Sequence, residues 1–228
     1  MPLFLKHTKP LWGVWKIEES PDELLSLFTQ QTADLLPADM RAEKRKQEWL
    51  AVRLLLKELL GEEARIAYRP NGAPYLPERD LHISISHTKG YAAVILNGQS
   101  PTGIDIEYLN DRILRVRSRF MGEEEEKMID PQHEVEHSLV CWCAKETLFK
   151  LIGQSEIDFR KHILIQPFPY QASGSLLATE TRTPRMATYT LNYLVNKYFA
   201  MAWFRDMTVV KRPLLLNSAI MVLLFLIR

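Results

Sequence analysis

The chain has 228 residues, 46% of them hydrophobic, so it can bury a substantial core, and a disordered chain is excluded. Its formal net charge of +1 gives no global basis for binding nucleic acid or an anionic membrane. Any phosphate binding must therefore come from local clusters. Cys141 and Cys143, the two cysteines, have the spacing of neither a zinc site nor a disulfide, so we expect reduced, partly buried thiols.

The first hundred residues predict one strand, then two helices, then two further strands. Strands are expected over 12–17, 81–86 and 91–96, with helices starting at Pro21 and at Pro37, the second ending near Gly61. The second helix carries mostly positive charge, including Arg45 and Arg53. Because the connectors after residues 86 and 96 are short, we expect antiparallel neighbours and place His87 on the same small sheet as the next strand, 103–107.

That next strand places two carboxylates side by side. Because side chains alternate between the faces of a strand, Asp105 and Glu107 point the same way, while Ile104 and Ile106 pack on the other side. Two carboxylates held so close repel each other unless a cation lies between them.

The remaining segments add a third carboxylate and a lysine. Helices are expected over 112–121, 123–129 and 137–152, and strands over 163–168, 186–195 and 198–204, with Gly174 in a turn. Glu146 and Lys150 lie one turn apart on the last of these helices. Three carboxylates with lysines indicate a site for a hard metal ion beside phosphate.

These motifs, in this order, resemble those of the 4′-phosphopantetheinyl transferases of the larger single-chain class, which activates peptide and polyketide synthases. Residues 103–107 match the family motif Gly-Ile/Val-Asp-Ile/Val-Glu, and residues 142–150 match Trp-x-x-Lys-Glu-x-x-x-Lys. Residues 85–88 resemble its Ser-His-Ser/Thr turn, and Arg119-Phe120-Met121 followed by Glu125 resembles a further element. Order and spacing agree over about 41–153, and the last third is similar only in pattern.

The resemblance implies that the phosphopantetheine arm of coenzyme A is moved to a serine of an apo acyl or peptidyl carrier protein, with release of 3′,5′-adenosine bisphosphate. It also implies an α+β fold of two similar halves with small antiparallel sheets, related by a pseudo-twofold axis, with coenzyme A in the cleft between them. We place the halves at 1–101 and 102–210, followed by an apolar tail, 211–228, of unknown role. The length favours a monomer.

The resemblance also suggests roles for particular side chains. Mg²⁺ would be held by Asp105, Glu107 and Glu146, with Lys150 on the pyrophosphate of coenzyme A. His87, Arg45 and Arg53 are the other predicted coenzyme A contacts. The base that takes the proton of the attacking serine is left open between Glu125, Glu146 and a metal-bound water.

Three observations limit the resemblance. Family members often carry glycine where this chain has Val52, and a basic residue where it has Ala73. Without that basic residue the loop at Ala73 is not expected to contact phosphate, unless Arg69 makes the contact instead. The apolar stretch 214–227 is shorter than a membrane span and has no explanation. The start of the chain lacks the pattern of a secretory signal, so we expect a cytoplasmic protein. The net charge gives no reason to expect a nucleic-acid partner, and a membrane partner is not expected although the apolar stretch stays unexplained.

Each motif alone has an ordinary structural explanation. An isolated Asp-x-Glu is more often a solvated strand end, and Glu146 with Lys150 is an ordinary helix-surface pair. The joint order of the motifs carries the assignment. The alternatives are another Mg²⁺-dependent phosphoryl or nucleotidyl transferase, although no Gly-x-x-x-x-Gly-Lys-Ser/Thr loop is present, and a non-catalytic carrier-protein or nucleic-acid binder using the basic helix.

Overall fold

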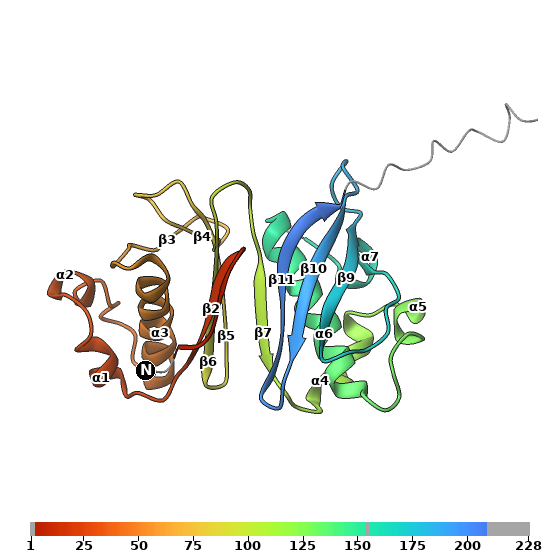
Figure 1. Cartoon of the computed structure of the whole chain (residues 1–228), viewed down its shortest axis with the longest axis horizontal. Helices are drawn as coiled ribbons and strands as arrows, with labels where there is room; N and C mark the ends of the chain where they lie inside the picture. Colours follow the sequence, from red (N-terminus) through yellow and green to blue (C-terminus); the bar gives the residue numbers. More distant parts are fainter. Residues whose placement is uncertain (1–2, 154–155, 209–228) are drawn as a thin grey trace, which may run out of the picture.

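The computed structural model describes residues 3–153 and 156–208, with side chains as far as Arg205. Its layers follow the order helix, sheet, sheet, helix, from left to right in Figure 1. The fold is α+β, as predicted, with antiparallel sheets. The predicted apolar tail, 211–228, lies outside the described residues. None of the helices described here combines the length and the apolar character that crossing a bilayer requires.

The N-terminal sheet has strand order β1-β2-β6-β5, and one of its faces packs against α3. Its strands are β1 (Leu3–Thr8), β2 (Leu11–Lys16), β5 (His82–Thr88) and β6 (Tyr91–Asn97), and the other elements of this half are α1 (Pro21–Leu25), α2 (Gln30–Ala33), α3 (Glu43–Leu60), β3 (Ala67–Tyr68) and β4 (Pro74–Tyr75). Helix α3 begins at Glu43, not at the predicted Pro37, and ends at Leu60, followed by Gly61, whose φ of 82° suits glycine.

The C-terminal sheet has strand order β7-β11-β10-β9-β8, and α6 covers its outer face. Its strands are β7 (Ile104–Tyr108), β8 (Ile163–Ile165), β9 (Ser173–Glu180), β10 (Thr188–Val195) and β11 (Phe199–Thr208), and its helices are α4 (Arg112–Val116), η1 (Arg117–Arg119), α5 (Glu123–Glu126), α6 (Glu134–Ile152) and α7 (Phe159–His162). Gly174, predicted in a turn, lies inside β9 opposite Tyr193. A Cβ there would lie 3.0 Å from the Tyr193 hydroxyl, so this glycine makes room for a ring and does not turn the chain.

The predicted pairing of β5 or β6 with β7 is wrong. Strands β5 and β6 belong to the N-terminal sheet, whereas β7 pairs with β11, so His87 does not share a sheet with Asp105 and Glu107. The physical reason is that β7 packs against the face of another layer and does not extend the N-terminal sheet. Its apolar residues, Ile104 and Ile106, are fully buried in a cluster between the two sheets.

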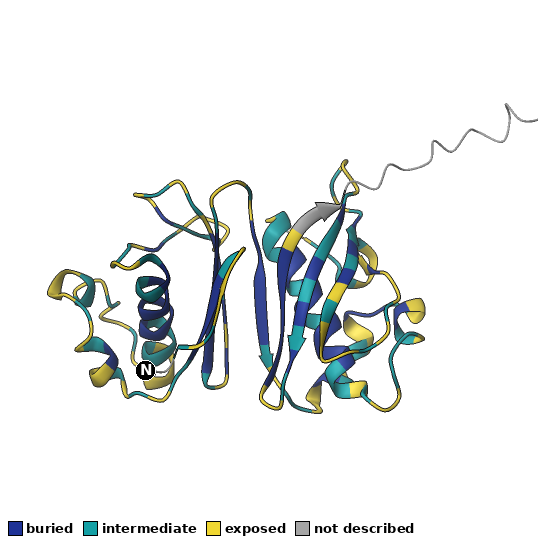
Figure 2. Ribbon diagram, in the orientation of Figure 1, coloured by how far each residue is buried: buried dark blue, intermediate teal, exposed yellow. Residues whose placement is uncertain are grey.

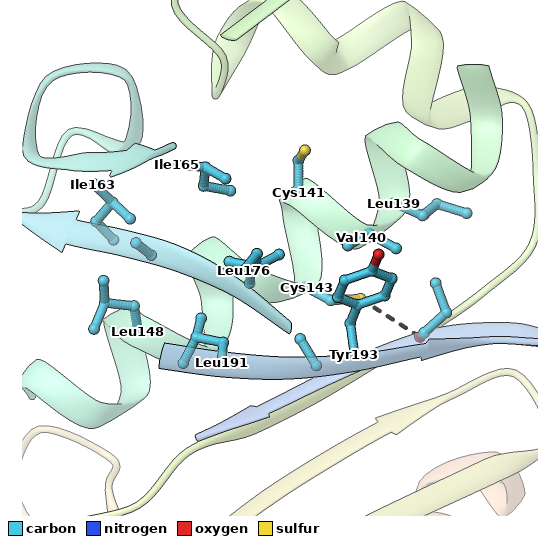
Figure 3. Packing of buried hydrophobic residues seen from close by; sticks show 14 of the residues in the cluster. Leu139, Val140, Cys141, Cys143, Leu148, Ile163, Ile165, Leu176, Leu191 and Tyr193 are labelled. Atoms are coloured by element: carbon cyan, nitrogen blue, oxygen red, sulfur yellow. Dashed lines mark hydrogen bonds between the residues drawn. The ribbon is translucent and has the colours of Figure 1, made fainter. Parts of the chain in front are cut away.

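Apolar side chains fill all three gaps between the layers. In Figure 2 much of the ribbon of α3, β7 and α6 carries the dark blue of buried residues. Cys143 faces the C-terminal sheet, with its Sγ 3.5 Å from the carbonyl oxygen of Ala200, whereas Cys141 points away from the sheet in the same buried cluster (Figure 3). Both are free thiols, and burial raises the pKa of each thiol. They are therefore inert core residues.

Helix α6 comes very close to the start of β7 at Gly103. A Cβ at this position would collide with the carbonyl oxygen of Thr147 in α6. The absence of a side chain at Gly103 therefore allows the helix to lie directly over the strand that carries the two carboxylates.

Candidate active site

Asp105 and Glu107 both face α6, as the alternation of the strand predicts. Lys150 donates from Nζ to Asp105 Oδ1 at 2.7 Å and to the carbonyl oxygen of Ile104 at 3.1 Å. Two helical turns earlier, Trp142 donates from Nε1 to Glu107 Oε1 at 3.2 Å. The strand and the helix are thus joined at two points that each involve one of the carboxylates.

Glu146 lies between these two points. Trp142, Glu146 and Lys150 are spaced by four residues each, so they form one stripe along α6. Because the first is bonded to Glu107 and the third to Asp105, the middle residue faces the space between the two strand carboxylates. The structure therefore brings the three predicted metal ligands and Lys150 into one neighbourhood.

Electrostatics supports this proximity. Burial, and then the charge of Asp105, raise the pKa of Glu146 to about 7. The pKa of Glu107 is raised as well, first by burial and then by Asp105. The positive charge of Lys150, whose Nζ lies 2.7 Å from Asp105 Oδ1, opposes both shifts.

The donor set suits a hard divalent ion, although the side chains do not converge on one. Within residues 3–153 and 156–208, no three His, Cys, Asp or Glu side chains are arranged to hold a metal. One atom nevertheless lacks a partner: Asp105 Oδ2 is buried and accepts no hydrogen bond. A buried carboxylate oxygen without a donor is costly, and a cation would satisfy it.

A cavity of about 700 Å³ adjoins this group and contains all four predicted coenzyme A contacts. It lies between α3, the loop before β4, strand β5 and the end of α6, so both halves of the chain contribute to it. Arg45, Arg53, His87 and Lys150 line it, together with apolar walls that include Val52 and Phe149. Lys150 therefore contacts both the cavity and Asp105.

Arg53 is the most buried cation of the cavity, at 7% exposure. Its guanidinium lies 3.3 Å from the centre of the Trp49 ring and donates to the Trp49 carbonyl oxygen at 3.2 Å. Burial lowers its pKa to about 10, so it remains charged at neutral pH. No carboxylate in the described part of the chain pairs with it. A buried cation without a counter-ion indicates an anionic ligand.

Two further contacts refine the predictions for the cavity. Arg69 is exposed, stacks on Tyr75 and does not line the cavity, so nothing in the structure supports it as a replacement for the basic residue absent at Ala73. Glu48 was not predicted as a site residue. It lines the cavity, and its Oε2 lies 3.5 Å from Nδ1 of His87. The signal for Glu48 was its position one turn after Arg45 on the basic helix.

Glu125, one of the three candidates for the base, lies apart from the other carboxylates. Lys145 donates to its Oε2 at 2.7 Å, and the two side chains are 0% and 7% exposed, respectively. Backbone amides occupy the remaining positions, that of Gly122 on Oε2 and that of Ile165 on Oε1. These contacts favour a structural ion pair, and none of them supports the role of base, which stays a prediction.

Trp142 also has more than the core role that its sequence position predicted. Its indole packs on Phe120 and Phe159, with centroid distances of 5.0 and 5.5 Å, while its N–H reaches Glu107. The available signal was its spacing of four residues before Glu146, which puts both on one face of the helix.

Comparison with known proteins agrees with this geometry. A model of the 4′-phosphopantetheinyl transferase superfamily matches residues 101–198, and a model of the N-terminal domain of 4′-phosphopantetheinyl transferases matches residues 36–97. The 4′-phosphopantetheinyl transferase AcpT of Escherichia coli, in strains K12 and O157:H7, is 29% identical over 176 residues, covering 71% of this chain and 90% of AcpT. A Haemophilus influenzae protein provisionally named as a 4′-phosphopantetheinyl transferase is 30% identical over 153 residues, covering 61% of this chain and 63% of that protein.

The chain therefore belongs to the 4′-phosphopantetheinyl transferase superfamily. The matched regions include β7 and α6, which carry the carboxylates, and α3 and β5, which line the cavity. Within the superfamily it is an enzyme, a 4′-phosphopantetheinyl transferase.

Proposed function

We propose that this enzyme transfers the 4′-phosphopantetheine arm of coenzyme A to a serine hydroxyl of an apo acyl or peptidyl carrier protein, with Mg²⁺ as cofactor and 3′,5′-adenosine bisphosphate as the second product. The observation that carries the proposal is the cavity of about 700 Å³, which is lined by Arg45, Arg53, His87 and Lys150 and meets the three carboxylates at Lys150. Since both halves of one chain line this cavity, we expect a monomer to be sufficient.

The cations of the cavity suit the separate phosphates of coenzyme A. Arg53 and Arg45 on α3 are proposed to bind the 3′-phosphate, with His87 donating a further hydrogen bond to phosphate. Lys150, at the end of the cavity that meets Asp105, is proposed to bind the pyrophosphate. The apolar side chains between them exclude water from the rest of the ligand.

Asp105, Glu107 and Glu146 are proposed to hold Mg²⁺, since they offer hard oxygen ligands and Asp105 Oδ2 has no other partner. The bound ion would neutralise the charge that develops on the pyrophosphate oxygens. Glu146 is also our preferred proton acceptor among the protein's own carboxylates. It lies beside the other two proposed metal ligands, whereas Glu125 is held by Lys145.

The test is to incubate the protein with coenzyme A, Mg²⁺ and several apo carrier proteins, and to follow each carrier by mass spectrometry. We expect one serine of a carrier to gain the mass of one phosphopantetheine arm, and the gain to disappear when EDTA replaces Mg²⁺. The Asp105→Asn variant, which keeps the size of the side chain, is expected to lose the activity. Cleavage of coenzyme A or of a nucleotide with no carrier modified would instead favour another Mg²⁺-dependent phosphoryl transferase.

A further inference from the structure

Three hydroxyl side chains of β5 bond to the backbone of β7. Ser84, Ser86 and Thr88, here called the hydroxyl row, point from one edge of the N-terminal sheet. Their Oγ atoms accept hydrogen bonds from three alternate N–H groups of β7, those of Ile104 at 3.2 Å, Ile106 at 3.3 Å and Tyr108 at 3.0 Å. The row thereby joins the edge strands of two different sheets.

Two members of the row also contact the proposed metal ligands. Ser86 donates to Asp105 Oδ1 at 2.8 Å, and Thr88 donates from Oγ1 to Glu107 Oε2 at 3.3 Å. Ser84 contacts β7 through the Ile104 amide alone. Glu107 is thus held from both sides, by Thr88 from the N-terminal half and by Trp142 from the C-terminal half.

We propose that Thr88 and Trp142 are positioning residues that fix the carboxylate of Glu107 for metal binding. This inference rests on the proposed function. Each carboxylate oxygen has two lone pairs, and each donor occupies one of them, so one lone pair on each oxygen stays free for a cation. A carboxylate already fixed by two donors loses little conformational freedom when it binds the ion. The N-terminal half thereby shapes a metal site whose ligands all belong to the C-terminal half.

The test measures binding of Mn²⁺, used as a spectroscopic probe in place of Mg²⁺, to the full-length protein by electron paramagnetic resonance without coenzyme A. Thr88→Val keeps the shape of the side chain and removes its hydroxyl, and Trp142→Phe removes the indole N–H. Each is expected to weaken Mn²⁺ binding by about 10- to 100-fold, the usual effect of losing a partner of a metal ligand. Thr88→Ser, which restores the hydroxyl, is expected to bind Mn²⁺ within about 3-fold of the wild type.

Ser84→Ala is the matched control, because it removes a bond of the same row that touches no carboxylate. We expect it to lower the melting temperature about as much as Thr88→Val while leaving Mn²⁺ affinity unchanged. Equal loss of affinity in Ser84→Ala and Thr88→Val would show that the row acts only through the packing of the sheets, and would overturn the inference.

Different outcomes refute the positioning roles and the proposed function. If the wild type binds Mn²⁺ and modifies a carrier while Thr88→Val and Trp142→Phe bind Mn²⁺ equally well, only the positioning roles are refuted. If the wild type neither binds Mn²⁺ nor modifies a carrier, the proposed function itself is refuted, and the positioning roles fall with it.

Discussion

Ionisation of Glu146 destabilises the folded protein. Its pKa is about 7 when folded and 4.5 for the unperturbed group, so unfolded chains release this proton at lower pH than folded chains do. The stability that the protonated side chain allows is therefore complete below about pH 4.5 and is lost as the pH rises through about 7.

This shift predicts the behaviour of Glu146→Gln, which cannot ionise. In EDTA, its free energy of unfolding is expected to exceed that of the wild type by about 1–3 kcal/mol at pH 8, with a smaller difference at pH 5. Urea unfolding at the two pH values measures the effect, and Glu134→Gln at the exposed start of the same helix serves as a control. A difference that does not depend on pH would contradict the assigned cause.

Lys150 links the cavity to the carboxylate group, so its loss has two consequences. Lys150→Ala leaves Asp105 buried without its cation, and we expect the free energy of unfolding to fall by about 1–3 kcal/mol. The Kd for coenzyme A is expected to rise by about 10-fold or more, measured by calorimetry, because a charge-assisted contact to phosphate is removed. Lys161→Ala, on the exposed surface, is expected to change neither quantity.

At the scale of elements, the buried ion pair of Lys145 in α6 with Glu125 in α5 holds several segments together. Lys145 also donates to the carbonyl oxygens of Phe159 at 2.8 Å and Ile163 at 2.7 Å, so one ammonium group ties together three segments of the C-terminal half. Breaking a buried pair on one side leaves an uncompensated charge.

We therefore expect Lys145→Met to lower the free energy of unfolding by about 3–5 kcal/mol. Glu125→Gln is expected to lower it too, while the kcat of the protein that remains folded stays close to that of the wild type. Chemical denaturation and steady-state kinetics below the melting temperature separate the two effects. A large loss of kcat in Glu125→Gln with stability unchanged would restore Glu125 as the base.

The approach of α6 to β7 depends on Gly103. Gly103→Ala is expected to push the helix off the strand, because the new Cβ meets the rigid backbone oxygen of Thr147. Both the melting temperature and the affinity for Mn²⁺ should fall. Gly98→Ala is the matched control in the same connector, since its Cβ would make an ordinary 3.5 Å contact with Leu81, and its melting temperature should stay near that of the wild type.

The sequence predicted those parts of the site that depend on local periodicity. Strand alternation placed Asp105 with Glu107, and helical spacing placed Glu146 with Lys150. The partners of His87 and Glu125 depend instead on how separate elements pack, and no spacing in the chain encodes this. For the same reason the sequence did not show that β7 belongs to a second sheet, because a five-residue strand between short connectors fits either pairing.

At the scale of the whole molecule, the two halves share one interior. Trp12 of β2 lies 4.9 Å from Trp203 of β11, measured between ring centroids, and Met201 is fully buried between the sheets. Because this apolar contact adds to the hydroxyl row, we expect thermal unfolding as a single cooperative transition in calorimetry.

Met201→Ala should lower the free energy of unfolding by about 2–5 kcal/mol while keeping one transition. Leu27→Ala, at an exposed site, should have little effect. Two resolved transitions in the wild type would show that the halves unfold independently.

The hydroxyl row also bears on how this chain avoids unwanted association. An edge strand normally offers a line of vacant amides that a strand from another molecule can join. In β7, short side chains from a neighbouring layer already engage these amides at alternate residues. Direct main-chain pairing there would have merged the sheets into one continuous surface. Serine and threonine at these positions thus keep the two sheets separate and leave the edge of β7 with fewer free amides for a strand of another molecule.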